Sequence, residues 1–489
     1  MNSPNNKLAE DINSKARVFV QNQLTISEAR LKGYVFERPN WAYPKRFAYY
    51  RVEKYIKDFL LRKIRERYVA IPGLSGTGKT TILAQIFMTF RNRLKDRHIL
   101  YISLEQAATA GASLQDVFDA YEHILGISFE KLEDPILLLI DEVHQDKDWT
   151  RTIKSLYDRT TKIFVVFSGS SAVSIQIEKY DLARRTFFEK LYPLSFCEFL
   201  MLKNNHFPDK KLKEELKEAL YFSPSAKEAY EKLNRLSERV NAQWKVIDRN
   251  DVSLYLDTGT LPYTLKSKLA DQVKILETVS QMMDKIINTD IQQIGRFDVN
   301  TLSKIKPLLF VLADTNTMSV NRCSEALGIT NVTLNLILDT LTQAELIIRV
   351  PALGLAGKIA RKEAKYLFMT PAIRVALSVI TGSDGTTMMR RGYQLEDIVG
   401  LHFYREFVAP GFGLLAYDRT QGGADFILSI RGNGKIAFEV GLGHKSGKQA
   451  NATQKRVKTK YGVTISDSAL LLDEDNSSLH LPLDYFLLI

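Results

Sequence analysis

The stretch that most constrains this chain is a glycine-rich turn between an apolar segment and a helical one. Residues 67–81 read RYVAIPGLSGTGKTT and fit the pattern G-x-x-x-x-G-K-[ST] from Gly73 to Thr80. Glycines let such a loop wrap closely, so that its backbone N–H groups converge on phosphates at the start of the next helix. We predict a phosphate-binding loop, with Lys79 on the β- and γ-phosphates and the Thr80 hydroxyl on Mg²⁺. The residues expected to contact ATP are Gly73, Ser75, Gly76, Thr77, Gly78, Lys79, Thr80 and Thr81.

A continuous apolar run that ends in two carboxylates supplies the second half of the predicted site. Residues 134–145 read DPILLLIDEVHQ, which is typical of a central parallel strand buried on both faces. A buried strand rarely ends in two adjacent carboxylates without a cation to meet them. We therefore expect Asp141 to hold the Mg²⁺ through water and Glu142 to polarise the attacking water as the catalytic base.

Two further short runs of β-branched and aromatic residues, 98–104 and 162–172, alternate with helical stretches. This alternation predicts an α/β fold with a doubly wound parallel sheet. The second run ends in Ser168 and Ser170, level with the carboxylates. These hydroxyls suit a sensor of the γ-phosphate or a group that orients water. They suit equally well a plain helix N-cap, Ser171 included.

Composition bounds the remaining possibilities. A chain of 489 residues implies about two to four domains. No apolar run approaches the ~18 residues needed to span a bilayer, and the polar N-terminus has no apolar signal core. We therefore expect a cytoplasmic protein without a membrane partner, with Cys197 and Cys323 as buried small hydrophobes. A net charge of +11 permits a polyanionic partner, although a basic surface that binds nothing fits the charge as well.

The order of motifs along the chain resembles a known family. The matching segments read DEVHQDKDWTRTIKSLYD from Asp141, VVFSGSSA from Val165, and DLARRTFFEKLYPLSFCEFL over 181–200. They are similar to prokaryotic AAA-type P-loop ATPases that carry a winged helix and a C-terminal restriction-endonuclease-like, or PD-(D/E)XK, domain of unknown function. The resemblance covers about residues 47–489.

This resemblance implies a division of the chain and one further catalytic residue. The implied parts are an N-terminal extension (1–46), an ATPase core (47–200), a helical lid (201–300), a winged helix (301–380) and a restriction-endonuclease-like domain (381–489). Arg185 aligns with the arginine of the family's Leu-Ala-Gly-Arg run, while Arg184 replaces its glycine. Either arginine is suited to reach the γ-phosphate of a neighbouring subunit in a homo-oligomer. The alternative is that both are ordinary surface charges beside Asp181 and Glu189.

Residues 318–350 have the spacing of a helix-turn-helix. Gly328 is expected to turn the chain, Thr330 or Asn331 to cap the second helix, and LIIRV to begin a wing strand. The second helix would present Asn331, Thr333 and Asn335 but no lysine or arginine, which disfavours a sequence-specific reader. The following segment offers basic residues for phosphate contacts, with a purely packing role as the alternative. These are Lys358, Arg361, Lys362 and Lys365.

The C-terminal stretch has the carboxylates of a PD-(D/E)XK site but not its lysine. Glu396 lies on a predicted helix, while Asp425 and Glu439 lie on successive predicted strands and would bind a divalent metal. Gly441 stands where the pattern has lysine, and Lys445, Lys448 or Lys455 could supply a migrated one. Without a lysine near the scissile phosphate we expect binding rather than cutting. Gly441→Lys should restore some cleavage if the geometry survives.

Three functions fit these motifs. The first is Mg²⁺-dependent ATP hydrolysis coupled to non-sequence-specific binding or remodelling of DNA, aided by the basic segment 445–460. The second is a nucleotide-controlled switch for a protein partner, in defence or regulation, with slow hydrolysis. The third is an active metal-dependent DNA nuclease with a migrated lysine. The sequence does not separate DNA from RNA.

Overall fold

The computed structural model of the chain divides into two compact units, Met1–Tyr192 and Pro193–Ile489. The described residues are 4–39, 41–170, 182–265, 272–315, 317–354, 364–381, 387–443, 445–475 and 477–489. None of the helices in these ranges has the length and apolar character to cross a membrane. Cys197 and Cys323 are both free and buried, as predicted.

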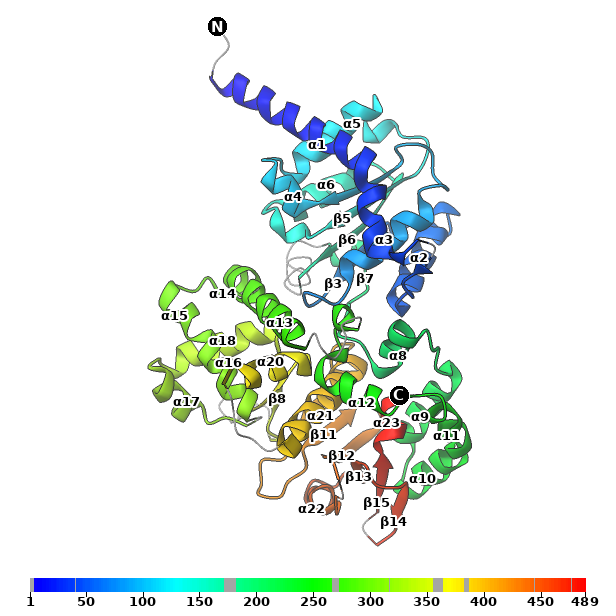
Figure 1. The fold of residues 1–489 in the computed structure, drawn as a ribbon, viewed down its shortest axis with the longest axis vertical. Coiled ribbons are helices and arrows are strands. Elements are labelled where there is room, and N and C mark those ends of the chain that lie inside the picture. The colour runs from blue at the N-terminus through cyan, green and yellow to red at the C-terminus, as the bar shows by residue number, and fades with distance from the viewer. Residues whose placement is uncertain are drawn as a thin grey trace. The chain divides into compact units, whose positions relative to one another are not determined.

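A five-stranded sheet forms the centre of the first unit (Figure 1). Its order is β4-β5-β6-β3-β7, and every pair of neighbouring strands is parallel. The predicted α/β fold with a parallel sheet is thus confirmed. The strands are β3 (Tyr68–Pro72), β4 (Ile99–Ser103), β5 (Ile136–Asp141), β6 (Ile163–Gly169) and β7 (Thr186–Phe188).

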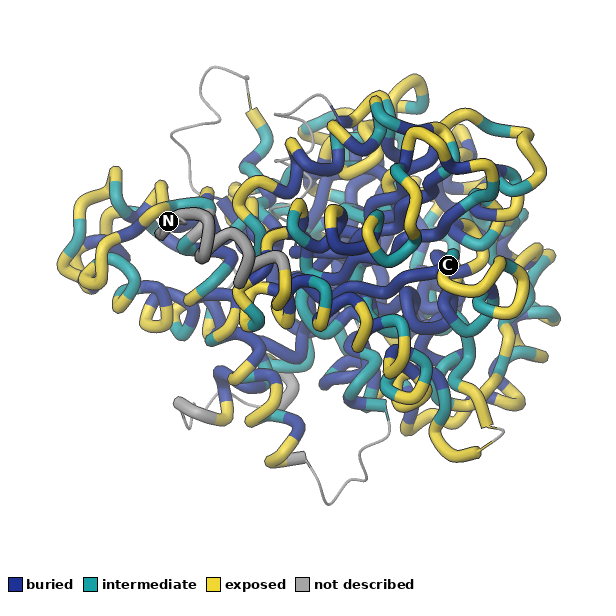
Figure 2. Tube along the Cα trace, turned by 90° about the horizontal axis from the view of Figure 1, so that it is seen from above, coloured by how far each residue is buried: buried dark blue, intermediate teal, exposed yellow. Residues whose placement is uncertain are grey.

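Helices cover both faces of this sheet, because alternate strand residues point to opposite sides. Val69 and Ile71 of β3 pack in one apolar cluster with α2 (Phe47–Leu60) and α3 (Lys79–Phe90). Their neighbours Tyr68 and Ala70 pack in the other cluster with α5 (Leu114–Leu125) and α6 (Trp149–Arg159). The buried strands and the more exposed helix surfaces can be followed in Figure 2. The strand ends that carry the predicted site are held between two packed layers.

The N-terminal helix α1 (Pro4–Val35) is part of this core. Its residues Ala16, Phe19 and Val20 belong to one apolar cluster, whereas Leu31 and Val35 belong to the other. Because α1 also contacts the edge strand β4, it crosses from one face of the sheet to the other along that edge. A small hairpin, β1 (Phe36–Arg38) and β2 (Trp41–Ala42), then leads the chain to α2. The described part of residues 1–46, to which the sequence assigned no role, is therefore an integral part of the first unit.

A six-stranded mixed sheet forms the centre of the second unit, in the order β10-β11-β12-β13-β15-β14. Strands β10 to β12 are antiparallel neighbours, and β12, β13 and β15 run parallel. Helix α21 (Thr387–Phe403) precedes the sheet, and α22 (Lys448–Val457) crosses from β12 to β13. The strands are β10 (Gly413–Ala416), β11 (Phe426–Ile430), β12 (Gly434–Val440), β13 (Tyr461–Ser466), β14 (Leu471–Asp473) and β15 (Ser478–Pro482).

Three helices within the predicted lid contact the mixed sheet or the short helix that follows it. The Tyr461 hydroxyl donates to the carbonyl oxygen of Leu220, in α9 (Lys210–Phe222). The indole of Trp244, at the end of α11 (Ser237–Trp244), donates to the Asp484 carbonyl at 3.0 Å. Helix α10 (Ala226–Arg235) packs on β14 and β15. These helices thus cover the C-terminal sheet; their role as a lid stays a prediction.

Two short helices and a hairpin occupy the position of the predicted helix-turn-helix. Helix α17 (Val320–Leu327) ends at Gly328, whose φ of 66° allows the turn. The Thr330 side chain accepts the Thr333 amide and caps α18 (Asn331–Gln343), so the predicted turn and cap are confirmed. Strands β8 (Ile347–Pro351) and β9 (Ala364–Phe368) pair antiparallel after α18. The basic residues Lys358, Arg361 and Lys362 lie outside the described residues.

The structure describes further helices in the second unit. They are α8 (Phe196–Asn204), α12 (Asn250–Leu254), α13 (Gln272–Ile286), α14 (Gln292–Gly295), α15 (Val299–Ser303), α16 (Ile305–Asp314), α20 (Pro371–Thr381) and α23 (Leu483–Leu487).

Candidate nucleotide site and C-terminal carboxylate cluster

The predicted phosphate-binding loop lies between β3 and the start of α3. Gly76 and Gly78 have φ values of 80° and 94°, in the left-handed region that favours glycine. A Cβ at Gly73 would collide with the carbonyl oxygen of Leu191. The glycines at these three positions are therefore required by the backbone path itself. The loop wraps at the N-terminus of α3, where free N–H groups favour an anion.

The side chains of the loop are held in place by a network of hydrogen bonds. Lys79 is buried, and its Nζ donates to the carbonyl oxygens of Gly73 at 2.9 Å and Leu74 at 3.2 Å. The Thr77 carbonyl accepts from the guanidinium of Arg46 at 2.8 Å, and Arg46 also donates to the Tyr192 carbonyl at 2.9 Å. Arg46 thus fastens the loop from outside. Sequence analysis missed it because an arginine in a segment without a motif carries no signal.

Asp141 is the centre of the second half of the site. Thr80 donates its hydroxyl to Asp141 Oδ2 at 2.7 Å, Tyr101 donates to the same oxygen at 3.0 Å, and Ser168 donates to Oδ1. Burial raises the pKa of Asp141, as does the neighbouring Glu142, while Ser168, Thr80 and Lys79 oppose the rise. A carboxylate whose charge is costly in a buried place is suited to receive a cation.

Thr80 and Asp141 fit a Mg²⁺ ion, because they bring hard oxygen ligands together at the mouth of the phosphate loop. Of the other residues that bond to Asp141, sequence analysis predicted one and missed another. Ser168 lies at the predicted sensor position and bonds to Asp141. Tyr101 was missed: it lies in the middle of β4, opposite Leu139 of β5, and its side chain reaches along the sheet to Asp141.

Glu142 is held in an unusual conformation next to a buried histidine. Its φ of 56° and ψ of 50° are left-handed, which is rare for a residue with a side chain and occurs often at functional sites. Its Oε2 lies 3.3 Å from His144 Nδ1, and that nitrogen lies 3.4 Å from the Ser170 amide. The Ser168 hydroxyl accepts from the Glu142 amide at 3.3 Å. Glu142 is therefore tied to the end of β6.

Ser170 offers a hydroxyl that could face a phosphate. Its Oγ is buried and has no hydrogen-bond partner among the described residues. A buried hydroxyl without a partner is uncommon and favours a missing ligand or water. Ser171, the alternative helix cap, lies outside the described residues.

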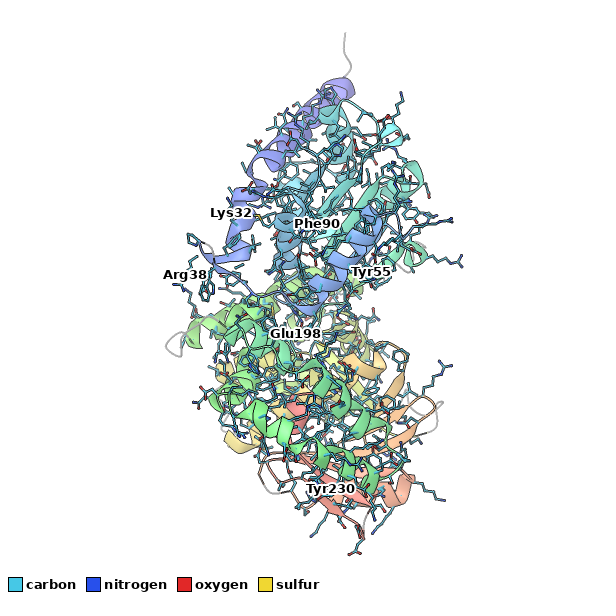
Figure 3. The ribbon with its side chains drawn as sticks, turned by 90° about the vertical axis from the view of Figure 1, so that its right-hand side faces the viewer. Lys32, Arg38, Tyr55, Phe90, Glu198 and Tyr230 are labelled. Atoms are coloured by element: carbon cyan, nitrogen blue, oxygen red, sulfur yellow. The ribbon has the colours of Figure 1, made fainter. Side chains whose placement is uncertain are left out.

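Arg185 lies away from these groups on the short 3₁₀ turn Ala183–Arg185. Its Nη1 is 3.4 Å from Asp158 Oδ1, and its guanidinium stands 5.0 Å from the centre of the Tyr157 ring. Glu189 accepts from Tyr55, labelled in Figure 3, at 3.1 Å, and from Arg51 at 2.6 Å. Asp181 is outside the described residues. The role of Arg185 toward a neighbouring subunit stays a prediction.

In the second unit, the predicted carboxylates are brought to one end of the mixed sheet, but each is already bonded. Asp425 Oδ2 accepts the Val440 amide of β12 at 2.9 Å. Glu439 is buried, and its Oε2 accepts the Gln449 amide at 3.0 Å in the first turn of α22. Among the described residues no group of three or more His, Cys, Asp and Glu side chains could hold a metal ion.

Lys365 of β9 enters the same cluster. Its Nζ lies 3.1 Å from Asp425 Oδ1 and also pairs with Glu396 of α21. Burial alone lowers the pKa of Lys365, but Glu396 and Asp425 outweigh it and raise that pKa above its ordinary value. The prediction that Lys365 grips nucleic-acid phosphates is wrong, because its side chain is only 6% exposed and is used internally. As arranged, the cluster does not fit a divalent cation, and the metal role of Asp425 and Glu439 stays a prediction.

The side chain of Lys445 lies against Gly441, the position where the PD-(D/E)XK pattern has its lysine. A Cβ built on Gly441 would collide with Lys445 Cε and lie 2.8 Å from its Nζ. Alternate residues of a strand share a face, so the Lys445 side chain covers Gly441 on the side to which Glu439 points. Gly441 is not in the left-handed region, so its backbone accepts a side chain once Lys445 moves.

Fold and site together define an AAA-type P-loop ATPase domain, and the family description "AAA domain" matches residues 65–200. The chain belongs to the same family as the uncharacterized protein MJ1637 of Methanocaldococcus jannaschii. The two are 33% identical over 451 residues, which cover 91% of this chain and 89% of that protein. An uncharacterized protein of Haemophilus influenzae is 24% identical over 407 residues, 79% of this chain and 86% of its own.

Solved structures give more distant likenesses. The ORC1 protein of Aeropyrum pernix in complex with DNA superposes with a TM-score of 0.33 at 13% identity, over 70% of this chain and 94% of that one. RuvB of Thermotoga maritima gives 0.29 at 15% identity, over 63% and 91%. At these scores the likenesses indicate nothing about function.

Proposed function

We propose that this protein binds and hydrolyses ATP with Mg²⁺ in the cytoplasm and couples hydrolysis to DNA binding or remodelling. The observation that carries the proposal is the bonded set around Asp141. Thr80 lies 2.7 Å from Asp141, and Glu142 follows directly in the chain. Thr80 is also the last residue of the glycine-rich loop that can receive phosphates, so the loop and Asp141 belong to one hydrogen-bond network.

Each residue has a separable task in this proposal. The loop amides and Lys79 hold the phosphates, while Thr80 and Asp141 hold Mg²⁺, which when bound neutralises charge on the phosphates. Glu142 orients the attacking water and accepts its proton. The buried Ser170 hydroxyl is positioned to donate to the γ-phosphate. Arg185 would add positive charge from a neighbouring copy in a homo-oligomer.

The second unit supports nucleic-acid binding through its shape and charge. A helix, three antiparallel strands, a crossover helix and a parallel strand follow one another from α21 to β13, and this order supports the proposed restriction-endonuclease-like domain. The hairpin after α18 supports a winged helix. At the end of α22 the side chains of Lys455 and Lys458 are exposed. These features favour contacts with a phosphate backbone over sequence reading.

The proposal is tested by measuring ATP hydrolysis with and without duplex DNA, beside a nicking assay in Mg²⁺ and Mn²⁺. A DNA-coupled ATPase should be stimulated many-fold by DNA. Hydrolysis that DNA leaves unchanged would contradict the coupling. The same titration with single-stranded and double-stranded RNA separates the two nucleic acids.

One observation favours the second candidate, a nucleotide-controlled switch for a protein partner. Glu142 is paired with His144 rather than standing free in solvent. A catalytic base that a neighbouring side chain holds activates water poorly, so ATP hydrolysis stays slow until ligand binding releases the base. Slow turnover that a protein partner, and not DNA, accelerates would support the switch.

Reversing two charges at the end of α22 should weaken DNA binding. Lys455 and Lys458 are the targets because both side chains are exposed at the end of α22. Lys455→Glu with Lys458→Glu should lower duplex affinity and reduce the slope of log affinity against log salt by about 2, one for each lost phosphate contact. Fluorescence anisotropy at several salt concentrations measures both quantities.

The matched control is the double variant Lys227→Glu with Arg235→Glu, at exposed residues of α10. It changes the net charge of the protein by the same amount. Equal effects of the two double variants would mean that only overall charge matters. An unchanged affinity in the α22 variant would place the DNA contact elsewhere.

The native chain should cut DNA weakly or not at all, because cleavage needs a metal as well as a positive group near the scissile phosphate. Supercoiled plasmid with Mg²⁺ or Mn²⁺ provides a sensitive test. Robust nicking that disappears in Asp425→Ala and Glu439→Ala would establish the third candidate, an active nuclease. Loss of that nicking in Lys445→Ala would identify Lys445, which covers Gly441, as the migrated lysine.

A further inference from the structure

A buried lysine is the cation of the C-terminal carboxylate cluster. Lys365 lies on β9, and its ammonium group contacts carboxylates from two other elements, Glu396 of α21 and Asp425 at the start of β11. The ring of Phe426 lies 4.8 Å from the same ammonium group. An ammonium group in such a place is stable only when opposite charges surround it.

The carboxylates leave little for a second cation. Asp425 uses Oδ1 for Lys365 and Oδ2 for the Val440 amide. Glu439 points one oxygen at the amides of Gln449 and Ala450 in α22. Adding a divalent ion beside the ammonium group would bring two cations together in a poorly solvated place, which is costly.

The lysine comes from outside the sheet that carries the acids. Strand β9 pairs with β8, with Val350 opposite Lys365, and not with any strand of the six-stranded sheet. The hairpin is also joined to the residue after β10 through its backbone, because the Leu353 amide donates to the Tyr417 carbonyl at 2.8 Å and the Tyr417 amide donates to the Pro351 carbonyl at 3.0 Å. The hairpin is thus fixed beside the C-terminal sheet, and the Lys365 side chain extends from it to the carboxylates.

We propose that Lys365 fills the cation position between Glu396 and Asp425, so that the C-terminal unit carries a latent divalent-cation site that the Lys365 ammonium group occupies. The ligand class is a small hard cation such as Mg²⁺ or Mn²⁺, for which two carboxylates and water are sufficient ligands. The inference rests on the proposed binding role of the C-terminal domain and gives a physical reason for the expectation that this domain binds rather than cuts.

The test counts Mn²⁺ ions bound to the full chain without nucleotide, by electron paramagnetic resonance of the free ion. Four proteins are compared: the wild type, Asp425→Asn, Lys365→Met and the double variant Lys365→Met with Asp425→Asn. The wild type and Asp425→Asn should bind the same number of ions. Lys365→Met should bind one more, and the double variant should lose it again. Any Mn²⁺ held by Thr80 and Asp141 is common to all four proteins and cancels.

Two results would overturn the inference. One is a Mn²⁺ ion on the wild type that Asp425→Asn loses, because the site would then be open in the native chain. The other is a Lys365→Met protein with a normal thermal transition and no additional ion. Should Lys365→Met not fold, Lys365→Gln, which keeps a polar group between Glu396 and Asp425, takes its place in both comparisons. Failure of the proposed ATPase or DNA binding would show in turnover or anisotropy and leave these ion counts unchanged.

Discussion

Glu142→Gln is expected to bind ATP as tightly as the wild type and to hydrolyse it at least about 100-fold more slowly. Glutamine keeps the size and shape of glutamate but cannot accept a proton from water. Glu142 contacts the Ser168 hydroxyl through its amide and His144 through its carboxylate, and neither contact belongs to the phosphate loop. The substitution should therefore slow hydrolysis without weakening ATP binding. A fluorescent ATP analogue measures the affinity, and phosphate release measures the hydrolysis rate.

The matched control for this substitution is Glu133→Gln, at an exposed carboxylate just before β5. It should leave both quantities unchanged. Wild-type hydrolysis by Glu142→Gln would remove Glu142 from the chemistry. Equal loss of binding and hydrolysis would instead assign it a structural role in the turn that its left-handed backbone makes.

Lys79→Ala should lose nucleotide affinity itself. The buried ammonium group is the one positive charge inside the loop, and its hydrogen bonds to Gly73 and Leu74 place it over the position for phosphates. Removing a charged hydrogen-bonding group should weaken ATP binding on the order of 100-fold, or about 2.7 kcal/mol, and abolish turnover. Isothermal titration with ATP and Mg²⁺ measures the affinity.

Lys131→Ala, at an exposed lysine of the same unit, is the control and should bind ATP normally. An affinity near the wild-type value in Lys79→Ala would show that the loop amides alone anchor the phosphates. The two variants Lys79→Ala and Glu142→Gln should thus fail at different stages of one cycle.

The parts of the site that were predictable from sequence are those with local spacing. A window of about a dozen residues is enough to recognise each of them, the loop from Gly73 to Thr80 and the end of the strand at Asp141. Their meeting follows from a parallel sheet, whose strands end at one edge. The cap at Thr330 was predictable for the same reason, because a helix cap needs only its own first turn.

The contacts that sequence analysis missed join residues far apart in the chain. Arg46 reaches Tyr192, Tyr101 reaches Asp141, and Lys365 reaches Asp425 across 60 residues. No periodicity marks such pairs, since each depends on how whole elements pack. Lys365 was even assigned to the wrong surface, because a lysine in a basic run is usually solvated.

The path of α1 has a consequence for how the nucleotide unit can be isolated. Strand β4 ends the parallel sheet, and α1 runs along that end from one face to the other. A fragment begun at residue 47 would leave the backbone groups of β4 unshielded, and an open strand of this kind recruits strands from other molecules. Such a fragment should precipitate or assemble into large particles, whereas one that keeps α1 should stay monodisperse. The smallest autonomous ATPase module therefore includes the helix that carries no motif.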